Sequence, residues 1–309
     1  MRIVPTLFAA LLLGTATAHA ATPYEQAFAA YQKGDYPLAL KLLKPLAEKG
    51  NVNAQYNVGV MYNNALGVKT DYAEAGKWFK LAAQQGNLYA EVDLGKLYEY
   101  GRGLQKDYKE ALRLFHLAAD KKSPAAELEL GSLYERGVGV TQDYKEAAKW
   151  YRLSADHGDN DAQYSLALMY ATGHGVPQDI KQAAVWYRKA ADQGNASAQL
   201  NLGAAFYAGQ GVPKNTKLAL KYFQLSAQQG NGRAQFNLAT LYTTGEGIKQ
   251  DLPRAFIWFT AAAVTLSGNE AKIANENSKA VAAKMTPSQV AEAKEIGRQC
   301  KVGDYKNCD

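Results

Sequence analysis

Apolar and small residues recur along most of the chain at intervals of three and four, the spacing of one face of an α-helix. Residues 54–62 show one such stripe, and a second follows at Ala75, Trp78, Phe79 and Ala82. A glycine-rich segment follows the first stripe in most units, and Gly-Asn follows the second. Each unit of sequence therefore predicts two helices joined by a short turn.

This two-helix unit occurs six times with a period of 36 residues. Its first alanine recurs without a slip, as Ala54, Ala90, Ala126, Ala162, Ala198 and Ala234. A Gly-x-Gly follows in five units, beginning at Gly101, Gly137, Gly173, Gly209 and Gly245. Glycine adopts positive φ at little cost, so it is predicted to end the first helix. The acid that follows, as at Asp71, suits the N-cap of the second helix.

A fixed period of this kind predicts a solenoid. The expected fold is all-α, a right-handed superhelix of helix-turn-helix repeats of 36 residues. All four tryptophans occupy one repeat position, which predicts that they pack in the core: Trp78, Trp150, Trp186 and Trp258.

The first twenty residues are predicted to be a signal peptide. Arg2 supplies a positive start, residues 7–13 are apolar, and Ala18-His19-Ala20 is the small-x-small pattern of a cleavage site. Cleavage after Ala20 would place the protein in the periplasm or outside the cell. No later segment reaches 18 uninterrupted apolar residues, so no membrane span is expected.

The rest of the chain divides into three predicted parts. Residues 21–52 are expected to form an N-terminal helical hairpin, and residues 53–268 hold the six repeats. Residues 269–309 are expected to form a polar, less regular connection, a capping helix and a tail. In an oxidising compartment Cys300 and Cys308 should pair and close that tail as a disulfide.

The formal net charge is +6, and it falls to +5 when Arg2 is removed with the signal peptide. Nucleic-acid binding requires a much denser basic surface, so nucleic acid is not an expected partner.

The motifs A-x-x-x-L-G-x-x-Y-x-x-G-x-G-V, D-Y-x-x-A-x-x-W-Y and A-A-x-x-G carry a family resemblance. They are most complete in residues 126–158 and 162–194. The chain resembles the Sel-one-like repeat family, a branch of the tetratricopeptide superfamily. The resemblance implies an interaction scaffold or adaptor that works in cell-envelope maintenance or stress signalling. It also implies an alternative: an immunity protein that neutralises an antibacterial phospholipase or wall hydrolase.

No pattern of catalytic or metal-binding residues accompanies the repeats. The Gly-x-Gly turns lack the further residues of a phosphate-binding loop, and no serine-nucleophile motif occurs. His116, His157 and His174 have no partner at ligand spacing, so neither a metal nor a cofactor is expected. A β-lactamase-like hydrolase is a remote third alternative. The family members linked to that activity carry a cysteine pair within each repeat, whereas the repeats of this chain contain no cysteine. We therefore expect no enzyme.

The partner is expected to be another protein, bound in the concave groove that the first helices line. The oligomeric state is open, with a monomer favoured. Residues on the stripe opposite the core vary between repeats and are the candidate contacts: Tyr56, Asn64, Lys96, Glu99, Tyr100, Ser132, Glu135, Arg136, Tyr164, Leu168, Thr172, Tyr207, Phe236 and Thr240. The first helices of the second and third repeats carry acids, and the second helices carry bases, which favours a partner with a basic segment and an apolar anchor. Ordinary solvated charge pairs explain the same pattern equally well.

Overall fold

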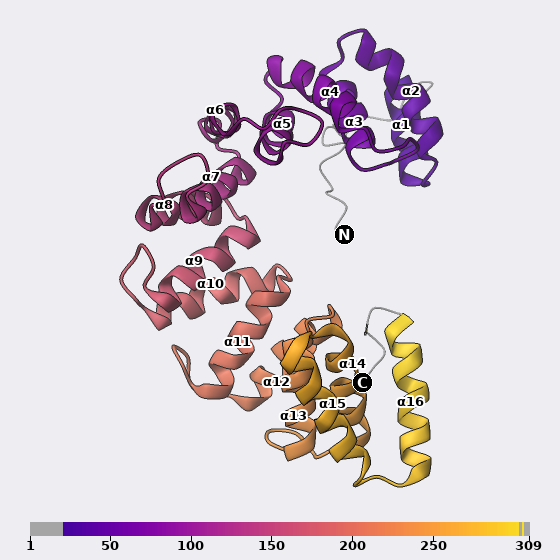
Figure 1. Cartoon of the computed structure of the whole chain (residues 1–309), viewed down its shortest axis with the longest axis vertical. Coiled ribbons are helices and arrows are strands. Elements are labelled where there is room, and N and C mark those ends of the chain that lie inside the picture. Colours follow the sequence, from indigo (N-terminus) through magenta and orange to yellow (C-terminus); the bar gives the residue numbers. More distant parts are fainter. Residues whose placement is uncertain (1–20, 303–304, 306–309) are drawn as a thin grey trace. The chain divides into compact units, whose positions relative to one another are not determined.

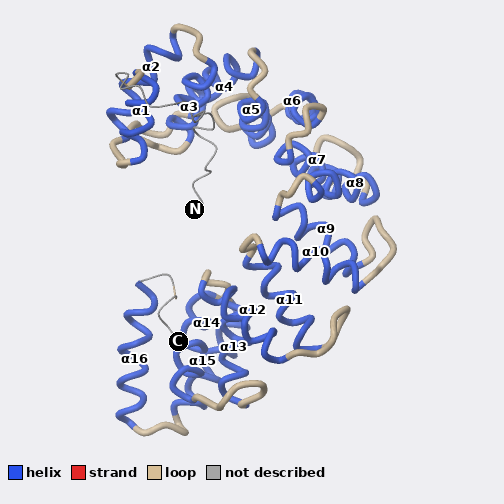
Figure 2. Tube along the Cα trace, turned by 180° about the vertical axis from the view of Figure 1, so that it is seen from behind, coloured by secondary structure: helices blue, strands red, loops and turns tan. Residues whose placement is uncertain are grey.

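The computed structural model describes residues 21–302 and 305, and all its regular elements are α-helices (Figures 1 and 2). The chain divides into two compact units, unit 1 up to Asp143 and unit 2 from Tyr144. Unit 1 contains α1 (Pro23–Gln32), α2 (Tyr36–Glu48), α3 (Val52–Asn63), α4 (Tyr72–Gln84), α5 (Leu88–Tyr100), α6 (Tyr108–Ala119) and α7 (Pro124–Arg136). Unit 2 contains α8 (Tyr144–Asp156), α9 (Asn160–Thr172), α10 (Ile180–Asp192), α11 (Ala196–Ala208), α12 (Thr216–Gln228), α13 (Gly232–Thr244), α14 (Leu252–Thr265), α15 (Gly268–Ala282) and α16 (Pro287–Val302). Odd-numbered helices up to α13 are the first of a repeat and even-numbered helices are the second.

The predicted signal peptide and Cys308 lie outside the described residues. Cleavage after Ala20 and the Cys300–Cys308 disulfide therefore stay predictions. Within residues 21–302, no helix is long and apolar enough to cross a membrane.

The helix ends follow the sequence prediction. Asp71 Oδ1 accepts a hydrogen bond from the backbone N–H of Glu74 at 2.9 Å and so caps α4. The first helices from α5 to α13 end at a left-handed glycine, as at Gly101 with φ of 66°. Two non-glycine residues take the same region of φ where the pattern departs from glycine, Ala65 at 56° and Lys122 at 61°. These two junctions carry backbone strain that the other repeats avoid.

Glycines in two kinds of position allow close approach. The mid-helix Gly59 lies against a core ring of its paired helix, since a Cβ there would be 2.6 Å from Phe79. The second glycine of each turn seats the loop on the preceding repeat. At Gly175, with φ of 71°, a Cβ would lie 2.0 Å from the carbonyl oxygen of Tyr144, at the start of α8. The Gly-x-Gly turn is therefore both a helix stop and a contact between repeats.

A buried hydrogen-bonded seam joins neighbouring helices near the start of five first helices, α3, α5, α9, α11 and α13. In unit 2, Gln199 Nε2 donates to the carbonyl of Ala191 at 3.1 Å, and its Oε1 accepts from Gln229 at 2.8 Å. Gln55, Gln163 and Gln235 make equivalent bonds. In the repeat of α5 and α6 the pair is ionic instead: Glu91 is fully buried and accepts from Lys121 Nζ at 2.8 Å.

The tryptophans are core residues to different extents. Trp258 is fully buried, and Trp186 and Trp78 are 4% and 8% exposed. Trp150 is only partly buried. The shared repeat position therefore predicts the packing direction of these rings, and the neighbours decide how completely each is covered.

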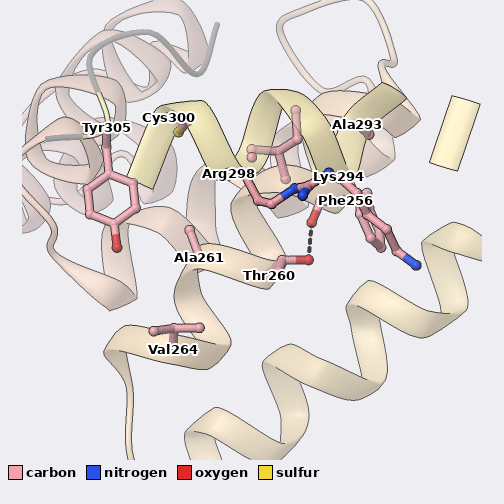
Figure 3. Close-up of a pocket in the computed structure, with 11 residues that line it drawn as sticks. Phe256, Thr260, Ala261, Val264, Ala293, Lys294, Arg298, Cys300 and Tyr305 are labelled. Carbon is pink, nitrogen blue, oxygen red and sulfur yellow. Dashed lines mark hydrogen bonds between the residues drawn. The ribbon is translucent and has the colours of Figure 1, made fainter. Parts of the chain in front are cut away.

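The C-terminal part differs from the expected irregular connection, because residues 268–282 form the regular helix α15. α16 follows as a cap and packs on α14. Between α14 and α16 lies a largely apolar hollow of about 360 Å³, and Figure 3 shows Ala261 and Val264 of α14 and Cys300 of α16 among its lining residues.

Candidate functional site

In unit 1, three of the four charged residues predicted for the groove, Lys96, Glu99 and Arg136, form ion pairs within the chain. Lys96 Nζ of α5 lies 2.8 Å from Glu129 Oε1 of α7. Arg136 Nη2 donates at 2.8 Å to Glu99, whose side chain is 2% exposed, and Arg136 Nε donates to Ser132 Oγ at 3.1 Å. These side chains are engaged within the chain.

The remaining candidates of unit 1 lie around this cluster. Tyr56 donates to Asp93 Oδ2 at 3.1 Å, and its ring lies 5.8 Å from that of Phe79. Asn64 is the exposed C-cap of α3, and the Glu135 carbonyl accepts from Gln142. Tyr100 is exposed over 49% of its surface. Unit 1 therefore presents a polar ladder across α3, α5 and α7: Tyr56, Asp93, Lys96, Glu129, Glu99, Arg136 and Ser132.

Asp93 has an unusual proton affinity within this ladder. Burial raises the pKa of its carboxyl, although the Lys96 ammonium and the Tyr56 hydroxyl oppose the shift. The folded state therefore holds a proton on Asp93 more tightly than the unfolded chain does.

Asp93→Asn should flatten the pH dependence of stability. In the parent, the free energy of unfolding contributed by Asp93 falls as pH rises from about 4, the unfolded pKa, through the raised folded pKa. The variant lacks this loss and should gain stability relative to the parent towards neutral pH. Urea unfolding of both proteins from pH 4 to pH 8 measures the difference. Parallel pH profiles would contradict the assignment.

In unit 2, two adjoining hollows lie along the first helices. The larger, about 430 Å³, lies between α11, α13 and α15 and is lined by Leu200, Asn201, Ala204, Arg233, Phe236, Asn237, Leu266, Glu270 and Ile273. The smaller, about 230 Å³, is lined by Ala171 of α9, by Ile180, Ala183, Ala184 and Tyr187 of α10, and by Asn201, Ala204, Ala205 and Gln210 in and beside α11. Asn201 and Ala204 belong to both, so we call the two hollows together the inner groove.

The inner groove has an apolar floor with a few polar groups. Arg233 and Glu270 form an ion pair at 2.8 Å on its α13–α15 side. The Asn201 amide hydrogen-bonds the Tyr187 hydroxyl, and burial raises the pKa of Tyr187 to about 12, so this phenol stays protonated. This mixture of apolar surface and a few oriented polar groups is typical of binding sites.

Phe236 is the predicted site residue that lines the inner groove. The centre of the Tyr164 ring lies 6.0 Å from that of Tyr187, with the two planes tilted by 44°, and Tyr207 donates to Glu246 at 2.8 Å. Thr172 and Thr240 donate to the backbone carbonyls of Leu168 and Phe236. The other five predicted residues of unit 2 lie on α9, α11 and α13 but outside the lining of the two hollows: Tyr164, Leu168, Thr172, Tyr207 and Thr240.

The sequence analysis missed Asn201, Asn237 and the α15 residues. The two asparagines share one repeat position, 36 residues apart, next to the predicted stripe. In α15, Ala274, Ser278 and Val281 are buried at helical spacing. Because Ala274 and Ser278 are small, the sequence shows no clear apolar stripe in this segment. The helix that places Glu270 and Ile273 beside the groove was therefore not predicted.

The Sel1 repeat family model matches seven consecutive segments, residues 24–51, 52–87, 88–123, 124–159, 160–195, 196–231 and 232–263. The chain belongs to the Sel1 repeat family. The first segment covers the N-terminal hairpin, so the family pattern begins one repeat before the six found from sequence. Sel1 repeat proteins are generally non-catalytic interaction scaffolds. In the part of this Sel1 repeat protein that the structure describes, no three His, Cys, Asp or Glu side chains gather as metal ligands.

Solved structures similar to this Sel1 repeat protein include one from Oxalobacter formigenes, with 32% identity and a TM-score of 0.67, covering 81% of this chain and 99% of that chain. A protective antigen of uropathogenic Escherichia coli shares 27% identity with a TM-score of 0.49, covering 93% and 85%. An immunity protein of Pseudomonas aeruginosa shares 21% with a TM-score of 0.45, covering 74% and 81%. No curated protein sequence matches the chain.

Proposed function

We propose that this protein is an exported scaffold or adaptor that binds a segment of a partner protein in the inner groove of unit 2. The observation that carries the proposal is the continuity of the groove. Two hollows adjoin at Ala204, so one segment can lie across α11, α13 and α15. The family supports a binding role, and the features of residues 1–20 support export to the periplasm.

The groove suits a segment with apolar anchors rather than a highly charged one. Leu200, Phe236 and Ile273 supply apolar contact area, while Asn201 and Asn237 offer amides that match backbone N–H and C=O groups. The charges of the polar ladder in unit 1 pair with each other, so they add less to affinity than their number suggests.

Ala204→Asp should abolish capture of the partner. Ala204 is exposed in the free protein, so the new carboxylate is solvated there and the fold should tolerate it. A bound segment would bury this charge, and Arg233, which lines the same hollow, is already paired with Glu270, which predicts a loss of affinity of about 100-fold or more. The measurement is a crosslinked pull-down from the periplasm with residues 21–309 as bait.

Leu117→Asp is the matched control, because Leu117 is also exposed but lies on the second helix α6 of unit 1. Partner capture lost in Ala204→Asp and kept in Leu117→Asp supports the groove. One stoichiometric partner would indicate a dedicated adaptor or an immunity protein, and several weak partners would indicate a scaffold. Equal capture by both variants would overturn the assignment of the groove.

A further inference from the structure

The charge of unit 2 is concentrated on its second helices. Helices α8, α10, α12 and α14 carry nine Lys or Arg and three Asp or Glu, a net charge of +6. The first helices α9, α11 and α13 carry one of each sign and are neutral. The second helices of unit 2 are therefore strongly basic, and its first helices are not.

Nine exposed residues form a regular pattern on three of these helices, at positions i, i+4 and i+8 of each. They are Lys145, Lys149 and Leu153 on α8; Lys181, Val185 and Lys189 on α10; and Lys217, Lys221 and Leu225 on α12. We call this set the basic grid. The spacing places each triplet on one face of its helix. Each triplet includes one exposed aliphatic side chain, with exposures of 44%, 49% and 37% in chain order.

Contacts between the helices place the three rows beside one another. The Arg152 guanidinium of α8 lies 5.1 Å from the centre of the Trp186 ring on α10. The charge of Arg188 on α10 opposes the burial that raises the pKa of Tyr222 on α12, so these two side chains lie close together. The rows therefore form one surface of unit 2.

The acidic residue that pairs with a lysine of the basic grid on α8 has no equivalent on α10 or α12. On α8, Glu146 pairs with Lys149 at 2.6 Å. The equivalent positions on α10 and α12 are Gln182 and Leu218. Within the described part of the chain, Lys181 and Lys217 form no ion pair, so their charges are available to an external anion.

The last repeat supplies an internal contrast. On α14 the three equivalent positions are Pro253, Ile257 and Ala261, with no lysine. Ile257 is 4% exposed, and the side of α14 that bears Ile257 and Ala261 faces α16 across the hollow of Figure 3. Where the chain covers this side of a second helix the positions are uncharged, and where it leaves the side open they are mostly lysine.

We propose that the basic grid binds the surface of an anionic phospholipid bilayer. Lysines close to such a surface are attracted to its headgroups, and aliphatic side chains between them enter the interface. The inner groove shares no residue with the grid, which is a broad array across three helices and suits an extended surface better than a peptide. This inference goes beyond partner binding and lies on a different face, so either proposal can fail without the other.

The test is co-sedimentation of residues 21–309 with vesicles. This chain contains every helix that the structure describes and lacks the apolar run at residues 7–13. Vesicles of equimolar phosphatidylglycerol and phosphatidylcholine should bind it at low salt, and pure phosphatidylcholine vesicles should not. At about 1 kcal/mol per lysine, the triple variant Lys181→Gln/Lys217→Gln/Lys221→Gln should lower the partition coefficient on the order of 100-fold.

The control variant Lys249→Gln/Lys272→Gln/Lys279→Gln removes the same charge from exposed positions of unit 2 outside the grid. It should retain most of the binding, and circular dichroism should show equal helix content in all three proteins. Equal losses in the two variants would overturn the grid as a site. The proposal would also be overturned if the parent protein did not bind anionic vesicles, whether or not it bound an acidic polypeptide such as polyglutamate.

Discussion

Gly175→Ala is expected to lower the free energy of unfolding of unit 2 by about 3–5 kcal/mol. Two costs add at this position. The residue has φ of 71°, where an L side chain is strained by about 1–2 kcal/mol. The new Cβ would also lie 2.0 Å from the Tyr144 carbonyl oxygen, so the loop between α9 and α10 must move away from the start of α8.

Gly158→Ala separates the two costs. Gly158 has φ of 95°, but its Cβ would meet nothing within 4 Å, so only the backbone strain remains. Urea unfolding of both variants should therefore show a clearly smaller loss for Gly158→Ala. Equal losses would mean that the contact between repeats adds nothing to stability.

Trp258→Ala should cost about 3–5 kcal/mol, the range for removing a buried large aromatic side chain. Trp258 is fully buried on α14, a helix that contacts α13, α15 and α16. Its loss opens a cavity in the repeat that holds the C-terminal cap, so thermal unfolding of unit 2 should begin at a lower temperature.

Trp150→Ala is the matched control, because Trp150 occupies the same repeat position and lies in the same unit. The ring is only partly buried, so less surface returns to water and the loss should be markedly smaller. Thermal melts followed by circular dichroism would compare the two. A larger loss for Trp150→Ala would contradict the burial that separates them.

The sequence was sufficient for those parts of the fold that depend on local chemistry repeated many times. Asp71 as an N-cap and Gly101 as a left-handed stop require only their own neighbours, and six repeats made the period unmistakable. Helix α15 escaped prediction because its buried stripe consists of small residues, Ala274 and Ser278, which resemble polar surface in a sequence.

The candidate site was predicted only in part. Its helices and Phe236 follow from the repeat pattern, but the partners of charged side chains do not. Glu99 and Arg136 are 37 residues apart, and only their placement on neighbouring first helices shows that they bond. The inner groove likewise depends on how α15 packs beside α13, a contact outside the regular repeats.

The buried seam also bears on how such a chain can lengthen or shorten over evolution. Most side-chain pairs of the seam, such as Glu91 with Lys121, belong to a single 36-residue segment that begins at a first helix. Recombination at the ends of that segment moves both partners as one cassette, and the pairing survives in the new array. A crossover between α5 and α6 would join Glu91 to a foreign second helix and leave a carboxylate in the interior without its cation. Gene duplications that yield folded proteins should therefore respect the segment ends.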